Sequence, residues 1–123
     1  MAGWSVGARN GMLGQVRARI THLSIHTADP GADGSNEVSS GAYARVMALA
    51  GSGDFTAVAA GSFELDVDKA FVAAAAEDAN YYGCWEFDNP TWYYLGGGAI
   101  TGDNAFNAVG DFTLQAGTAF RLT

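Results

Sequence analysis

Apolar and polar residues alternate along much of this chain with the two-residue period of extended strands. In the clearest segment, 20–27, two histidines and a serine fall on one face, and Leu23 and Ile25 fall on the other. Similar short segments recur between Gly, Asn, Asp and Pro residues, and they predict strands at 20–27, 42–49, 55–59, 62–67, 81–87, 92–99, 111–114 and 118–122. The pattern predicts a mainly β protein, either an antiparallel β-sandwich or a jelly roll.

One long helix is predicted, close to the N-terminus. Ser5 is a suitable N-cap, and apolar residues recur at near-helical spacing as far as Val16. The three glycines within this stretch each cost up to about 1 kcal/mol relative to alanine, so the helix needs a neighbour to pack against. We assign residues 1–18 to an N-terminal arm and short helix of a single domain, 1–123. The alanine-rich segment 69–78 favours a second short helix, with a strand as the alternative.

A dense cluster of turn residues follows the first predicted strand. The sequence Asp29-Pro30-Gly31 fixes one φ at about −65° and frees the next, because proline restricts its backbone and glycine does not. Aspartate, serine and asparagine side chains further on can bond to their own backbone. We therefore predict an ordered surface loop and assign a structural role to His26, Asp29, Pro30, Gly31, Asn36, Glu37 and Arg45.

Residues 21–45, THLSIHTADPGADGSNEVSSGAYAR, resemble a motif of small bacteriophage virion proteins with the pattern T-[HY]-[VL]-S-[LI]-H-T-A-D-P-G-x-x-G-x-N-E-V-x-G-G-x-Y-A-R. The chain departs from the pattern at Ser40, where the family has the first glycine of a pair. That family includes tail fibre-like proteins and proteins that coat a capsid. The resemblance implies a β-sandwich component of the virion, and the motif does not choose between tail and capsid.

Composition limits the partners that the chain is expected to have. The formal net charge is −7, and the six Lys and Arg residues are scattered, whereas binding to nucleic acid needs clustered cations. Only 15% of the 123 residues are charged and 49% are hydrophobic, which indicates a surface used for contacts with neighbouring proteins. We find no signal peptide and no apolar run long enough to cross a membrane, so we expect assembly in the host cytoplasm without a membrane partner.

The segment 81–94 contains most of the large aromatic residues and has the shape of a hairpin. Aromatic residues fall on both faces of its first strand, so we expect one face in the core and the other at a contact. A core that buries both sets is the alternative, and a platform on which a sugar stacks is another. Our candidate interface residues are Trp4, Trp85, Trp92, Tyr93 and Tyr94.

Residues for catalysis are scarce. Cys84 is the single cysteine, which excludes an intrachain disulfide and a multi-cysteine metal site. The two histidines, His22 and His26, share a strand face and with Asp29 or Asp33 offer a weak metal-site possibility, but turn formation explains these aspartates better. We expect no enzyme activity, no metal and no cofactor.

Two functions agree with these observations. We expect most strongly a capsid decoration, or cement, protein that forms homotrimers and binds the major capsid protein, and so stabilises the assembled shell. The alternative is a tail fibre or tail-tip module that binds a glycan or a protein on the host surface through the aromatic hairpin. Both alternatives place the protein in the virion, in contact with copies of itself and with other virion proteins.

Overall fold

The computed structural model describes residues 4–39, 43–71, 79–100 and 112–121 and has one α-helix and antiparallel strands. The elements in chain order are α1 (Val6–Arg19), β1 (His22–His26), β2 (Val46–Met47), a single 3₁₀ turn (Ala50–Ser52), β3 (Ser62–Glu64), β4 (Lys69–Phe71), β5 (Tyr81–Asp88), β6 (Thr91–Ala99), β7 (Phe112–Leu114) and β8 (Ala119–Arg121). The predicted mainly β fold with an N-terminal helix is confirmed.

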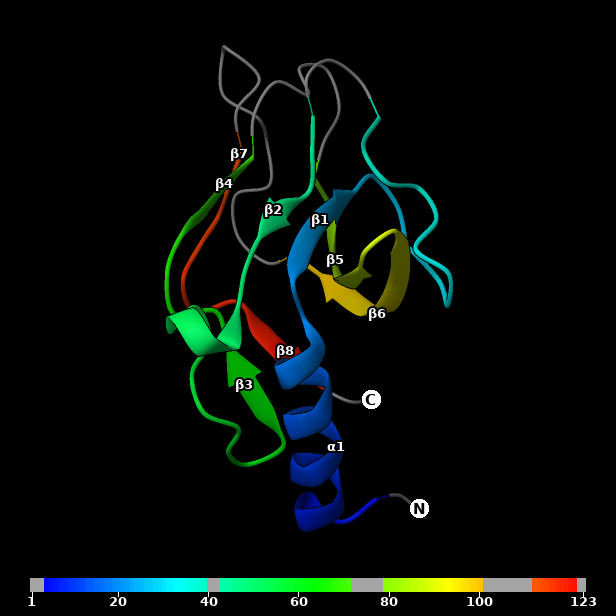
Figure 1. Ribbon diagram of the computed structural model, residues 1–123. Helices are drawn as coiled ribbons and strands as arrows, with labels where there is room; N and C mark the ends of the chain where they lie inside the picture. The colour runs from blue at the N-terminus through cyan, green and yellow to red at the C-terminus, as the bar shows by residue number, and fades with distance from the viewer. Residues whose placement is uncertain (1–3, 40–42, 72–78, 101–111, 122–123) are drawn as a thin grey trace.

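A four-stranded antiparallel sheet with the order β2-β1-β5-β6 is the centre of the fold (Figure 1). The remaining strands form two separate antiparallel ladders, β3 with β8 and β4 with β7. Figure 1 shows the two ladders on one side of the sheet and the loop that follows β1 on the other side. Both faces of the central sheet are therefore covered in part by the chain itself.

The hydrophobic core lies between the central sheet, α1 and the two ladders. Leu23 and Ile25 of β1 are fully buried, and Leu23 pairs with Cys84 of β5. Phe63 of β3 and Phe120 of β8 stack with their ring centroids 4.9 Å apart. Because these side chains come from four strands in two layers, burial of the alternating apolar positions holds the layers together.

Helix α1 begins where the sequence predicts. The side chain of Ser5 accepts a hydrogen bond from the backbone N–H of Ala8, which is the bond expected of an N-cap. Leu13 is the helix residue that is buried, while Val16 packs against the edge of the core. Residues 4–8 at the beginning of the helix are exposed, whereas Asn10 accepts a hydrogen bond from the N–H of Gly61 at 2.8 Å (Figure 1).

Two predicted elements differ from the structure. Residues 69–71 form strand β4, not a helix, because they pair with β7 and bury Phe71 completely; residues 72–78 of that prediction lie outside the described residues. Residues 55–59 form isolated bridges instead of a strand. There the carbonyls of Phe55 and Thr56 accept hydrogen bonds from the Arg17 guanidinium, and this use of the carbonyls interrupts a regular ladder.

Of the predicted strand 42–49, only Val46–Met47 is a strand among the described residues. Small parts of the predicted strands at 42–49, 111–114 and 118–122 lie outside the described residues. The predicted strands at 20–27, 62–67, 81–87 and 92–99 correspond to β1, β3, β5 and β6, with shifted ends. The described parts of the predicted strands at 111–114 and 118–122 likewise contain β7 and β8.

Candidate interaction surfaces around the motif loop

The loop at residues 27–38, here called the motif loop, is held by hydrogen bonds within itself. The Asp29 carboxylate accepts a bond from the N–H of Gly31 at 2.8 Å, and the Asn36 amide donates to the Asp29 carbonyl at 2.9 Å. The carbonyl of Pro30 accepts from two successive N–H groups. Asn36 has a φ of 63°, a left-handed conformation that asparagine tolerates. The turn chemistry in the sequence therefore produces one defined loop.

A directed chain of hydrogen bonds joins this loop to the sheet. The Trp85 indole N–H donates to the Ser24 hydroxyl oxygen at 2.8 Å, and that oxygen lies 2.7 Å from Nε2 of His26. Nδ1 of His26 lies 2.7 Å from the carbonyl of Ser35, which can only accept. The proton of His26 is thus on Nδ1, and Nε2 accepts the Ser24 hydroxyl proton. Burial lowers the pKa of His26 below its usual value and favours this neutral form.

Two glycines permit the short distances between side chains that this series of hydrogen bonds requires. A Cβ atom at Gly83 would lie 2.5 Å from the Ser24 hydroxyl oxygen and 2.6 Å from Nε2 of His26. A Cβ atom at Gly34, whose φ is 81°, would lie 2.7 Å from the Trp85 ring. A larger residue at Gly34 would push the motif loop away from Trp85, and one at Gly83 would displace the Ser24 and His26 side chains that connect the loop to the sheet.

Glu37 and Arg45 form the second connection. Nε of Arg45 donates to one carboxylate oxygen of Glu37 at 2.9 Å, and its Nη2 donates to the other at 2.7 Å. The Tyr43 hydroxyl also donates to Glu37 at 2.7 Å and accepts from the backbone N–H of Ile25. A planar guanidinium that holds both oxygens of a carboxylate is oriented as well as neutralised.

The same guanidinium lies over the aromatic residues of the hairpin. The Cζ atom of Arg45 is 3.6 Å from the Trp85 ring centroid and 4.6 Å from that of Trp92. Tyr94 packs edge-on against Trp85, with ring centroids 5.0 Å apart. Arg45 and Trp92, together with His22 and Glu37, line an open groove of about 400 Å³. This groove is a candidate surface for a partner.

The five candidate interface residues differ in exposure. Trp4 is 73% exposed, Tyr93 46% and Trp92 38%, so these three rings offer surface to a partner. Tyr94 is half-buried, and Trp85 is 7% exposed because the motif loop and Arg45 cover its ring. Trp85 therefore contributes to the fold. Sequence alternation could not distinguish Trp85 from Trp92, because the covering residues are distant in the chain.

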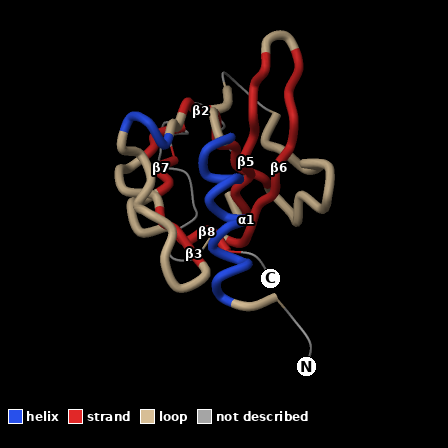
Figure 2. Tube along the Cα trace, turned by 60° about the horizontal axis from the view of Figure 1, so that its bottom comes forward, coloured by secondary structure: helices blue, strands red, loops and turns tan. Residues whose placement is uncertain are grey.

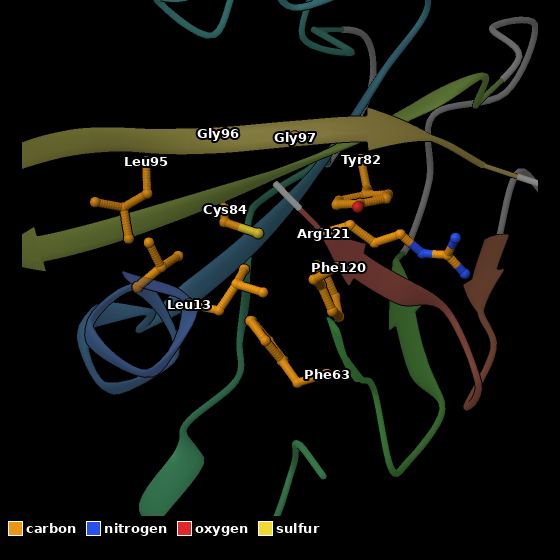
Figure 3. A pocket seen from close by; sticks show the side chains of 10 residues that line it. Leu13, Phe63, Tyr82, Cys84, Leu95, Gly96, Gly97, Phe120 and Arg121 are labelled. Carbon is orange, nitrogen blue, oxygen red and sulfur yellow. The ribbon is translucent and has the colours of Figure 1, made fainter. Parts of the chain in front are cut away.

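Cys84 and His26 are both buried in the folded protein. Cys84 is buried beside a small apolar pocket of about 70 Å³ between α1 and the sheet, where Figure 3 shows it near Leu13 and Phe120. Burial raises the pKa of its thiol to about 12, so the thiol stays protonated. Both ring nitrogens of His26 are used in hydrogen bonds, and in the described part of the chain no three His, Cys, Asp or Glu side chains converge as metal ligands. No helix among the described residues could cross a membrane.

Comparison with known families gives one match. Residues 14–118 match the family described as podophage GP4 fiber I protein gp80, and this range covers most of the chain. No curated protein and no solved structure matches. The match confirms the predicted bacteriophage virion component and supports the fibre-like part of the resemblance; the specific motif is not tested by it. The chain therefore belongs to the podophage GP4 fiber I protein family and is a structural component of a phage virion.

Proposed function

We propose that this protein is a subunit of a fibre on the podophage particle, present in several copies and held there by protein contacts. The family match over residues 14–118 is the observation that carries the proposal. The described surface supports it, since large hydrophobic side chains such as Trp4, Trp92 and Tyr93 are exposed and the motif loop is fixed by internal hydrogen bonds. A rigid domain with exposed aromatic residues is suited to assembly.

We place the attachment to the particle at the exposed beginning of α1. Trp4 precedes the Ser5 cap and is 73% exposed, the highest value among the exposed large hydrophobic residues. Figure 2 shows the start of α1 and the tip of the β5–β6 hairpin at opposite ends of the domain. Attachment through Trp4 would thus leave the hairpin free for other contacts. The major capsid protein, a neighbouring virion protein or a copy of this chain could receive Trp4.

Capsid decoration is the second candidate function. It draws support from the same exposed Trp4 and from the low charged fraction, both of which suit a protein that covers a shell. The family match names a fibre protein and gives no specific support for capsid decoration. The homotrimer and the binding of the major capsid protein stay predictions, as does binding of a host glycan or protein by Trp92 and its neighbours.

Copy number per particle, with localisation, tests the proposal. Quantitative gel densitometry of purified virions against the major capsid protein gives the number of copies, and antibody labelling in the electron microscope gives the place. A fibre subunit predicts a few tens of copies or fewer, with labelled fibres. Copies on the order of hundreds, spread over the shell, would establish decoration instead. Absence from purified virions would reject both candidates.

A predicted host contact has its own test. Trp92→Ala should abolish adsorption to host cells if Trp92 binds a receptor, while the particles keep their protein content and thermal stability. Val67→Ala is a suitable control, because Val67 is 39% exposed and lies outside the hairpin. Normal adsorption of the Trp92 variant would remove the hairpin from consideration as a receptor site.

A further inference from the structure

Strand β6 lies at an edge of the central sheet and lacks the charged and proline residues that often protect such an edge. It stands last in the sheet order β2-β1-β5-β6, and within the described part of the chain no strand pairs with its outer edge. Its nine residues, TWYYLGGGA, include no charged residue and no proline, which are the side chains that commonly prevent pairing between molecules. Figure 2 shows the β5–β6 hairpin projecting beyond the neighbouring elements. In the part of the chain that the structure describes, this edge is therefore open to pairing with an extended strand.

We propose that the outer edge of β6 pairs, antiparallel and about a two-fold axis, with β6 of a second copy of this chain. The inference rests on the proposed function of a fibre subunit present in several copies. Its basis is that the strand is complementary to itself: aromatic residues occupy 92–94 and small residues occupy 96–99. Reversing one copy against the other therefore places aromatic residues opposite glycine or alanine.

The bulge in β6 selects one register. Tyr93 pairs with Glu86 and Gly98 pairs with Tyr82, so both β6 residues lie on the helix side of the sheet. They share a side although they are an odd number of positions apart, because the register shift at Cys84/Trp85 leaves Leu95 without a partner on β5. Pairing Tyr93 with Gly98 of the second copy keeps the sides matched along the edge.

Backbone hydrogen bonds agree with that register. The N–H of Ile100 donates to Asn80 on the β5 side, so the N–H of Ala99 points away from β5. The N–H of Phe87 donates to the Thr21 hydroxyl on the β1 side, so its β6 partner Trp92 also turns its N–H and C=O outward. In the proposed register Trp92 lies opposite Ala99 of the second copy. Each can then donate to the other.

A groove beside the small-residue half can receive the aromatic side chain. About 470 Å³ of space lies between β6 and β8, bordered by Gly98, Tyr82 and Ala119. Figure 3 shows Tyr82 and Arg121 beside this part of β6. Within the domain, Tyr82 already covers Gly98 from the β5 side. The Tyr93 side chain of a second copy would cover the same glycine from the open side, a pairing known to stabilise antiparallel strands.

Ala99→Pro tests the edge without changing β5 pairing. Proline removes the outward N–H and places its ring at the edge, whereas the matched variant Ala99→Ser keeps the N–H. Sedimentation equilibrium of the purified full-length chain should show dimers for the wild type and Ala99→Ser. The dissociation constant of Ala99→Pro should be at least about tenfold higher, because the dimer loses two backbone bonds. Thermal unfolding confirms that each variant is folded.

Amide hydrogen exchange of the wild type locates the contact without a variant. The N–H groups of Gly97 and Ala99 should gain protection as protein concentration rises, and that of Met47, on the opposite edge strand, should not. The homotrimer predicted from the sequence is the competing arrangement, and finding it would overturn the inference. A monomer at the highest soluble concentration, or equal association of the proline and serine variants, would overturn it as well. Virion content is measured separately on whole particles, so failure of the fibre assignment and failure of this pairing are distinguishable.

Discussion

The guanidinium of Arg45 lies 3.6 Å from the Trp85 ring centroid while it holds both carboxylate oxygens of Glu37. Glu37 ends the turn cluster and Trp85 lies in the central strand β5, so one side chain fixes the motif loop and its following segment to the sheet. The salt bridge is partly shielded, with 22% and 20% of the two side chains exposed. Its stacking on Trp85 adds an attraction that depends on a planar cation.

Arg45→Lys should lower the free energy of unfolding by about 1–2 kcal/mol, although it keeps the charge. Lysine cannot hold both oxygens of Glu37 in one plane or stack flat on Trp85. The measurement is urea denaturation followed by tryptophan fluorescence. Arg19→Lys is the matched control: Arg19 pairs with Glu86 at an exposed site, so its replacement should leave stability nearly unchanged. An equal loss of unfolding free energy in the two variants would show that the stacking of Arg45 on Trp85 does not matter for stability.

Stability should decrease as the pH falls from about 7 to 5. Burial lowers the pKa of His26 in the folded protein, and the unfolded chain protonates at about 6.5. Below that pH the unfolded state binds the proton more readily than the native state, so protonation favours unfolding. Burial lowers the pKa of His22 in the same direction. Urea titrations at several pH values measure the slope, and His26→Gln should reduce it. An unchanged slope in that variant would exclude His26 as the source.

Gly83→Ala should destabilise the fold by about 1–3 kcal/mol, because its Cβ would meet Ser24 and His26 at less than van der Waals distance. The control is Gly11→Ala in the exposed part of α1, where the new methyl group meets nothing within 4 Å. That substitution should stabilise the helix by up to about 1 kcal/mol. Thermal denaturation compares the two directly. A stable Gly83 variant would show that the motif loop does not depend on the close approach.

Trp4→Ala should reduce incorporation of the protein into particles severalfold while leaving the melting temperature of the isolated domain unchanged. The side chain is 73% exposed, so its removal costs the fold little. Densitometry of virions produced with the variant measures incorporation, and Val67→Ala provides an exposed apolar control. Normal incorporation would place the attachment somewhere other than the beginning of α1.

The sequence by itself determined the elements whose signals are local. The Ser5 cap, the alternation of β1 and the turn residues from Asp29 to Asn36 each act within a few residues, and the structure has the helix, the strand and the ordered loop. The long hairpin β5–β6 was located by the same alternation. The alternation of apolar and polar residues and the hydrogen bonds of turn residues involve only positions close together in the sequence. They can therefore be interpreted without the rest of the chain.

Only the tertiary structure decided which side chains are covered and which short segments pair. Residues 69–71 have a helical composition but become a strand because β7 is beside them, and 55–59 are interrupted because Arg17, distant in sequence, takes their carbonyls. Trp85 and Trp92 look alike in sequence, yet Arg45 and the motif loop bury the first. The physical reason is that burial and pairing depend on chain segments brought together by folding, and no local pattern records those neighbours.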